Sequence, residues 1–238
     1  MKHCLYCYAE IGFESVWSKW LKPYAEVCET CKSQFQRIEG KVCLKCGRPY
    51  DVNWFTGTEM VCHDCKEMWA DTRFIKNTSL FLYDEAGQAW MAKFKFRGDV
   101  VLAQMFEAEI RAFWKRNQKN IDAIVVVPLS TERQQERRFN QAQVFAEMME
   151  HRKILTIFQK HHQSKQSKLG KYGRLHRENP FFFLENQENL HYFPKNVLIV
   201  DDIYTTGTTI HQICELIWQK SSSKIYSFTL FRASSIKK

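Results

Sequence analysis

The fold of this chain is decided by a stretch near its C-terminus, residues 197–209, which reads VLIVDDIYTTGTT. Its first four residues are apolar and mostly β-branched, which is typical of a parallel strand buried on both faces. Asp201 and Asp202 follow, and two adjacent carboxylates are costly there unless a vicinal diol or a metal ion pairs with them. Gly207 permits a tight turn among four threonines, and the helix start that follows offers backbone N–H groups to a phosphate.

This stretch resembles the phosphoribosyl pyrophosphate (PRPP) motif of type I phosphoribosyltransferases. By that resemblance, Asp201 and Asp202 hold the ribose hydroxyls, and Mg²⁺ accompanies PRPP. The residues that would hold the 5′-phosphate are Thr205, Thr206, Gly207, Thr208 and Thr209. Two other phosphate motifs are absent from the sequence, because no Gly-Lys-Thr/Ser follows a glycine loop and no Gly-x-Gly-x-x-Gly occurs.

Eight of the nine cysteines form four Cys-x-x-Cys pairs near the N-terminus. They are Cys4/Cys7, Cys28/Cys31, Cys43/Cys46 and Cys62/Cys65. Because the N-terminus does not read as a secretory signal, these pairs favour zinc over disulfides, and we expect two structural Zn²⁺ sites. Grouping in sequence order gives spacings that are usual for four-cysteine sites, while an interleaved grouping is the alternative. Cys214 stands apart and is expected to be a small core residue.

The chain is expected to form two domains, a four-cysteine zinc-ribbon module over residues 1–70 and a phosphoribosyltransferase-like domain over residues 71–238. In the second part strands and helices alternate, which predicts an α/β fold with a mainly parallel sheet flanked by helices. Residues 72–82 are expected to be a linker or the beginning of the second domain. Helices are expected over 84–98, 100–114, 139–149 and 211–219. Strands are expected over 121–127, 154–158, 181–184, 197–200 and 224–231.

A second group of candidate residues follows the buried strand at residues 121–127. Ligands of open α/β sheets bind beyond the carboxyl ends of the strands, so arginines there can reach a diphosphate. The candidates are Arg133, Arg137 and Arg138. The alternative is an exposed helix whose charges pair along its own surface.

A third group lies in a long basic segment, because no acidic residue occurs between Glu150 and Glu178. Its candidate residues are Lys165, Lys168, Lys171 and Arg174. The segment is interpreted as a lid over PRPP or as a track for a phosphate backbone, and the alternative is a solvated run of charge. The net charge of +9 is weaker support for a polyanionic partner, since two four-thiolate zinc sites would lower it to about +5. No apolar run is long enough to span a membrane, so a cytoplasmic protein is expected.

Nearly the whole chain resembles the ComF/ComFC family of late competence proteins. The match covers the cysteine pairs and residues 94–99, 128–142, 166–174, 197–209 and 231–232. The chain departs from the family at Arg138, where the family often has glycine. The resemblance implies a role in handling single-stranded DNA during natural transformation, beside a membrane-associated helicase and DNA-processing proteins. Through those partners the protein would work at the inner face of the membrane.

Three hypotheses about activity follow. In the first, a competence protein binds single-stranded DNA and PRPP or a related phosphate, with no turnover required. In the second, an active phosphoribosyltransferase transfers ribose 5-phosphate to an unidentified acceptor. In the third, a PRPP-sensing regulator binds duplex DNA. No segment identifies an acceptor, and a fold alone does not establish an activity, so the first hypothesis is favoured.

Overall fold

A computed structural model provides the fold. It describes residues 2–11, 27–55, 60–68, 73–96, 99–150, 153–161, 179–185 and 193–233. The core is a five-stranded parallel sheet in the order β3-β9-β8-β4-β5. Its strands are β3 (Phe74–Leu82), β9 (Lys224–Arg232), β8 (Asn196–Tyr204), β4 (Ala123–Val126) and β5 (Ile154–Leu155). The predicted α/β fold with a parallel sheet is therefore confirmed.

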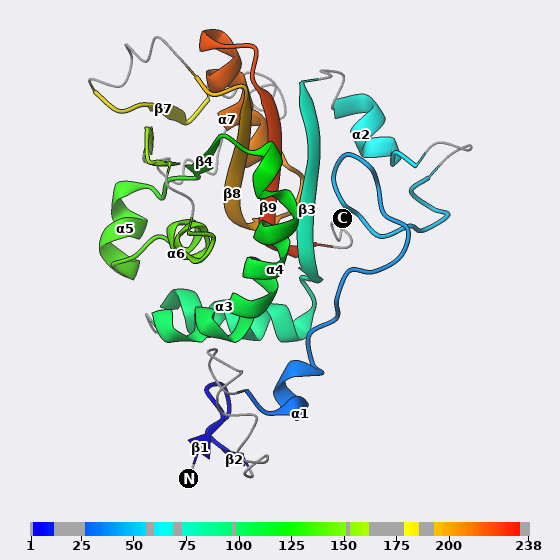
Figure 1. The fold of residues 1–238 in the computed structure, drawn as a ribbon, viewed down its shortest axis with the longest axis vertical. Helices are drawn as coiled ribbons and strands as arrows, with labels where there is room; N and C mark the ends of the chain where they lie inside the picture. The colour runs from blue at the N-terminus through cyan, green and yellow to red at the C-terminus, as the bar shows by residue number, and fades with distance from the viewer. Residues whose placement is uncertain are drawn as a thin grey trace, which may run out of the picture.

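Helices cover both faces of this sheet (Figure 1). One face carries α3 (Glu85–Phe96), η2 (Val100–Phe106), α4 (Glu107–Asn117) and α6 (Gln141–Met148). The other face carries α7 (Thr208–Lys220). In β8, Leu198 and Val200 join the first hydrophobic cluster, whereas Val197 and Ile199 join the second. This strand is buried on both faces, as its continuous apolar run predicted.

Several elements differ from expectation. The single helix predicted over residues 100–114 is divided into the 3-10 helix η2 and the α-helix α4. In η2 the buried pairs Leu102/Met105 and Ala103/Phe106 are each three residues apart, which is the repeat of a 3-10 helix. The predicted linker 72–82 is mostly β3, an edge strand of the sheet that pairs with β9.

The strand predicted over residues 154–158 is also divided. β5 pairs with β4, whereas β6 (Phe158–Lys160) forms a separate antiparallel pair with β7 (Phe181–Phe183). The rings of Phe158 and Phe183 lie 4.8 Å apart between their centroids, so aromatic packing favours the second pairing. The remaining elements are β1 (Lys2–His3), β2 (Glu10–Ile11), α1 (Glu29–Lys32), α2 (His63–Met68), η3 (Gln118–Asn120) and α5 (Thr131–Arg137).

The segment from residue 36 into the second cysteine region, residues 36–48, packs along the outer edge of β3 (Figure 1). The backbone N–H of Ile38 donates to Leu80, and that of Asn77 donates to Lys45. Gly47 has φ +69°, and a Cβ there would lie 3.0 Å from the carbonyl oxygen of Asn77, so this position requires glycine. These contacts satisfy backbone groups that an edge strand would otherwise expose. The domain boundary near residue 70 stays a prediction.

Candidate functional site

The acid pair lies inside β8 rather than beyond its end. The strand continues through both aspartates to Tyr204, and Asp201 pairs with Thr229 of β9. The backbone N–H of Asp202 donates to Oδ1 of Asp201 over 2.8 Å. Burial raises the pKa of Asp201 to about 7, and the negative charge of Asp202 adds to this effect. The two carboxylates are therefore costly to ionise together, as the sequence predicted.

A lysine from α3 partly neutralises this pair. Nζ of Lys95 lies 2.5 Å from Oδ2 of Asp202, and both side chains are mostly buried. The positive charge of Lys95 opposes the rise in the pKa of Asp201. Tyr83, at the end of β3, is also close, because burial and then the charge of Asp202 raise its pKa. Sequence reasoning left Lys95 and Tyr83 out of the site, although Lys95 falls in a segment that carries the family resemblance.

The threonine loop joins β8 to α7. Gly207 has φ +85° and precedes the first turn of α7, so the tight turn predicted from the sequence is present. The hydroxyls of Thr206 and Thr208 lie 2.8 Å apart, and both residues are exposed. Thr205 is exposed too, and Thr209 is partly buried. This loop presents hydroxyls and N–H groups to solvent beside the acid pair, which is an arrangement suited to an anion.

The arginines of the second group belong to α5, the helix that follows β4: Arg133 lies in its first turn, Arg137 is its last residue and Arg138 is its C-cap. Ser130 precedes α5, and the next helix, α6, is capped by Asn140, whose Oδ1 accepts from the N–H of Ala142 over 3.0 Å. Nδ2 of Asn140 also donates to the carbonyl of Val127 over 2.9 Å, so the end of β4 and the start of α6 are held together. The positions of Arg133, Arg137 and Arg138 are thereby fixed at the carboxyl end of the sheet.

The charge of Asp202 in the acid pair acts on Arg137, one of these arginines. Burial lowers the pKa of Arg137, the charge of Arg133 lowers it further, and Asp202 opposes both effects. Nη1 of Arg137 donates to Oε1 of Gln141 over 3.1 Å. Arg138 is exposed and ends α5 in the left-handed region, with φ +64°. Arg137 is therefore close enough to feel the charges of both Arg133 and Asp202. Arg138 adopts a backbone conformation that favours glycine.

Lys160 is a further basic residue near the acids that was not among the predicted site residues. It ends β6 and forms an isolated bridge with Ser130, at the entry to α5. Burial and then the charge of Arg133 lower its pKa, while Asp201 opposes them. Cations of three separate segments thus surround the acid pair. Lys165, Lys168, Lys171 and Arg174 lie outside the described residues.

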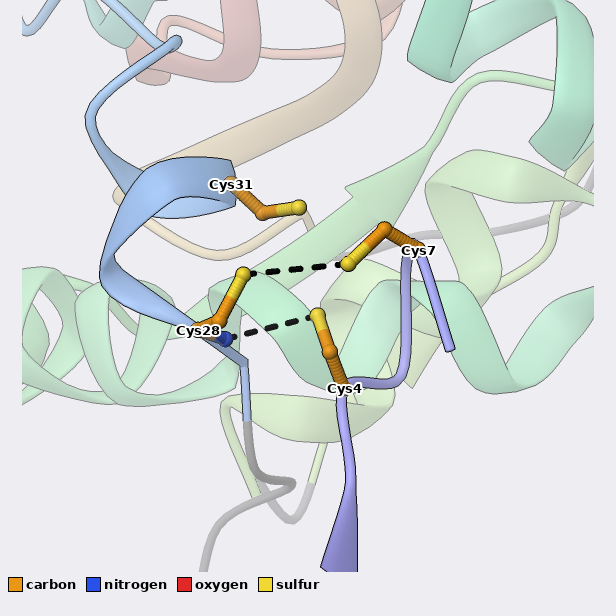
Figure 2. A group of neighbouring side chains, drawn as sticks. All are labelled: Cys4, Cys7, Cys28 and Cys31. Carbon is orange, nitrogen blue, oxygen red and sulfur yellow. Dashed lines mark hydrogen bonds between the residues drawn. The ribbon is translucent and has the colours of Figure 1, made fainter. Parts of the chain in front are cut away.

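The first cysteine group consists of Cys4, Cys7, Cys28 and Cys31. Figure 2 shows their sulfur atoms pointing toward one another, and these atoms all lie within 4.8 Å of each other. The backbone N–H of Cys28 donates to Sγ of Cys4 over 3.3 Å, a bond that favours a thiolate (Figure 2). Cys7 is exposed and Cys28 partly buried, whereas the other two are buried.

The second group consists of Cys43, Cys46, Cys62 and Cys65, and all four are buried. Their sulfur atoms also lie within 4.8 Å of one another. Hydrogen bonds from the neighbouring thiols lower the pKa of Cys43, so the cluster favours a thiolate. Both groups can hold a metal ion and are consistent with structural zinc. The grouping follows sequence order, which decides between the two arrangements left open by the spacing.

In the described part of the chain, none of the helices combines the length and the apolar character needed to cross a membrane. Comparison with known proteins finds no family model that matches. Two relatives carry the name competence protein ComFC. The one from Bacillus subtilis (strain 168) is 31% identical over 242 residues, which cover 97% of this chain and 95% of that protein. The one from Streptococcus pneumoniae (strain ATCC BAA-255 / R6) is 28% identical over 206 residues, which cover 87% of each chain.

Proposed function

The chain belongs to the ComFC family of competence proteins, and from this premise we propose that it serves natural transformation by binding PRPP, or a related phosphate, together with single-stranded DNA. One observation carries the ligand part of the proposal. Asp201 and Asp202 lie beside an exposed threonine loop at the carboxyl end of a parallel sheet, among Lys95, Arg137 and Lys160.

Each part of a phosphoribosyl ligand has a complement in this arrangement. Asp201 and Asp202 offer carboxylate oxygens to the two ribose hydroxyls, and residues 205–209 offer N–H groups and hydroxyls to the 5′-phosphate. Arg133, Arg137 and Arg138 are the candidates for the diphosphate, with Lys160 beside them. The same acid pair would also hold the Mg²⁺ that accompanies PRPP, since carboxylates are its usual protein ligands.

Binding, rather than turnover, is the function proposed. A phosphoribosyl transfer needs an acceptor held over C1 of the ribose, and no segment of the chain identifies such an acceptor. The metal ions proposed for the two cysteine groups are Zn²⁺, with a structural role. By family resemblance, the protein partners are a competence helicase and DNA-processing proteins. The proposed location is the cytoplasm, at the inner face of the membrane through those partners.

Isothermal titration calorimetry with PRPP and Mg²⁺ tests the ligand. Asp202→Asn is expected to weaken binding by about tenfold or more, because charge-assisted hydrogen bonds to a ligand contribute about 1.5–3 kcal/mol. Asp122→Asn is the matched control, since Asp122 lies before β4 at the opposite end of the sheet and accepts from the N–H of Asn196. If the Asp202→Asn variant binds PRPP with wild-type affinity, the acid pair is not the PRPP site.

Single-stranded DNA binding is tested by its dependence on salt. Replacing Lys165, Lys168 and Lys171 by Ala is expected to weaken binding and to reduce the slope of log K against log salt by about 2, since each phosphate contact on a single strand contributes about 0.7. The control replaces three exposed lysines outside the segment, Lys41, Lys115 and Lys119. Equal slopes for the two triple variants would show that net charge, and not this segment, supports binding.

A further inference from the structure

Arg232, the last residue of β9, is a buried arginine that contacts the second cysteine group. Only 2% of its surface is exposed. Its Nε atom donates to the carbonyl oxygen of Cys46 over 3.2 Å, and its Nη2 atom lies 3.5 Å from Sγ of the same cysteine. The two residues are 186 positions apart in the sequence. The guanidinium therefore ties β9 to one member of a four-thiol cluster.

The same guanidinium also contacts the start of the threonine loop. Its Nη1 atom donates to the carbonyl oxygens of Thr205 over 3.0 Å and Tyr204 over 3.3 Å, and to that of Ala233. The Tyr204 ring lies 4.8 Å from the guanidinium carbon. An arginine has five N–H donors in one rigid plane, so a single side chain holds groups of both sites at a fixed separation.

Fixing these carbonyls also orients donors of the loop. Because a peptide unit is planar, the carbonyl of Tyr204 and the N–H of Thr205 point in opposite directions and turn together. The same holds for the carbonyl of Thr205 and the N–H of Thr206. Arg232 binds the two carbonyls on the inside, and the two N–H groups are directed away from it. Arg232 thus orients the N–H of Thr206 through the carbonyl of Thr205. It orients the N–H of Thr205 together with the backbone N–H of Ala233, which also donates to the carbonyl of Tyr204 over 3.0 Å.

A buried polar network supports the same connection. Nδ2 of Asn77 donates to the carbonyl of Cys46 over 3.3 Å and to Oγ of Ser79 over 2.8 Å. Ser79 in turn lies 2.7 Å from Oγ1 of Thr229, which donates to the carbonyl of Phe231. The path runs from the cysteine group across β3 and β9 to the residue before Arg232. Networks of this kind are sensitive to the position of each member.

The cysteine group supplies two of the contacts of Arg232, the carbonyl oxygen and the sulfur atom of Cys46. Four thiolates around a divalent cation carry a net charge of −2, and a buried guanidinium at Cys46 offsets part of it. A bound cation would draw the four cysteines to one centre and hold Cys46 where its carbonyl and sulfur meet Arg232. Metal loading and the conformation of the loop are then linked through one side chain.

We infer that Arg232 is a positioning residue that couples metal loading of Cys43, Cys46, Cys62 and Cys65 to phosphate binding at residues 205–209. The inference rests on the proposed function of that loop as a phosphate site. Coupling between the affinities of two binding sites is reciprocal, so a phosphoribosyl ligand also tightens the binding of metal to this group.

Hydrogen exchange measured by mass spectrometry tests the coupling without any ligand. Arg232→Lys keeps the positive charge but loses the planar guanidinium with its several N–H donors. The variant is expected to raise hydrogen exchange of a peptide covering residues 204–209 by about tenfold or more, because charge-assisted hydrogen bonds to the loop are lost. Arg48→Lys is the matched control. Arg48 is 3% exposed, but its partners Asp64 and Trp54 belong to the cysteine segment itself. Unchanged exchange of the loop in Arg232→Lys, or equal changes in both variants, overturns the inference.

A second hydrogen-exchange experiment uses the wild-type chain, so its result does not depend on whether a variant folds. Stepwise removal of metal with a chelator is expected to raise exchange in residues 204–209 as the second group empties, while a peptide from β4 remains protected. Loop exchange that stays constant until β4 is also exposed overturns the inference, because the loop would then respond only to global unfolding.

Ligand titration separates this inference from the proposed function. If wild-type protein binds PRPP with Mg²⁺, Arg232→Lys is expected to lose about tenfold in affinity and to abolish the protection of bound metal by PRPP, whereas Arg48→Lys retains both. Wild-type PRPP affinity in a folded, metal-loaded Arg232→Lys variant overturns the coupling. If the wild-type chain binds no PRPP, the proposed function fails, and the two exchange experiments still decide whether Arg232 joins the metal site to the loop.

Discussion

Lys95 and Asp202, which lie 107 positions apart in the sequence, form an ion pair of 2.5 Å between Nζ and Oδ2. The pair brings α3 to the carboxyl end of β8 and places a cation beside two adjacent carboxylates. Its side chains are only 17% and 16% exposed, so water screens the interaction weakly. A single lysine thus partly offsets the repulsion between Asp201 and Asp202.

Lys95→Met is expected to destabilise the protein more at pH 8 than at pH 6. Without the cation, the pKa of Asp201 rises further above 7, and the repulsion acts fully only when both carboxylates are ionised. We expect a loss of about 1–3 kcal/mol at pH 8, below the range for a fully buried pair. Urea unfolding at both pH values measures it, with Lys115→Met on exposed α4 surface as control. An equal loss at both pH values would argue against this account.

Asp201→Asn is expected to stabilise the ligand-free protein, and more so at higher pH. The pKa of Asp201 is about 7 in the folded chain and 3.8 in the reference state. Between these values the folded state binds a proton that the unfolded state has released, so the contribution of Asp201 to stability falls as pH rises. Asparagine does not titrate. The advantage of the variant should therefore grow by about 1 kcal/mol between pH 6 and pH 8.

Unfolding is followed for this comparison in the absence of Mg²⁺ and phosphate, since either ligand alters the charge of the pair. Asp122→Asn, with the same chemical change at the other end of the sheet, shows how much of the slope belongs to the rest of the molecule. A difference between wild type and Asp201→Asn that is independent of pH would mean that Asp201 is ionised throughout this range.

The parts of the site that are local in sequence could be predicted. The acid pair, the turn at Gly207 and the start of α7 follow one another in the sequence. The spacing of the cysteine pairs is also visible in the sequence itself. Cys214 is fully buried on α7, as its place in the helical pattern predicted. Such features can be predicted from the periodicities of strands and helices and from the chemistry of each residue type.

The parts that depend on strand order could not be predicted. β3 and β9 are the first and last strands of the sheet in sequence and are neighbours in it. The cysteine segment pairs with β3 at Asn77, and the two arrangements together bring Arg232 to Cys46. Lys95 reaches Asp202 because α3 follows β3 and crosses the sheet face. The η2 segment was predicted as α-helix because repeats of 3.0 and 3.6 residues are hard to tell apart over seven residues.

The two cysteine groups are expected to release bound metal at different rates. Cys7 is exposed in the first group, whereas the members of the second group are at most 3% exposed and packed in the core. A chromogenic chelator should therefore release metal in two phases of equal amplitude, the fast phase from the first group. Cys7→Ser should remove the fast phase and leave the slow one. A fast phase that survives this substitution would reverse the assignment.

Arg138→Gly is expected to stabilise the protein and to weaken its binding of a diphosphate. Arg138 has φ +64° and ψ −3° at the C-terminus of α5, where its N–H donates to the carbonyl of Gln134. A non-glycine residue in the left-handed region costs about 1–2 kcal/mol, and glycine costs about 0.5–1 kcal/mol in chain entropy, so the net gain should be about 0.5–1 kcal/mol.

Arg138→Asn is the matched variant, because asparagine tolerates the left-handed region better than arginine and also removes the charge. Both substitutions should weaken binding of pyrophosphate by a similar factor, but only the glycine should give the full gain in unfolding free energy. A glycine variant that is less stable than wild type would show that the Arg138 side chain makes contacts that outweigh the strain. Unchanged pyrophosphate affinity in both variants would exclude Arg138 from the diphosphate site and leave Arg137, on which Asp202 acts, and its neighbour Arg133.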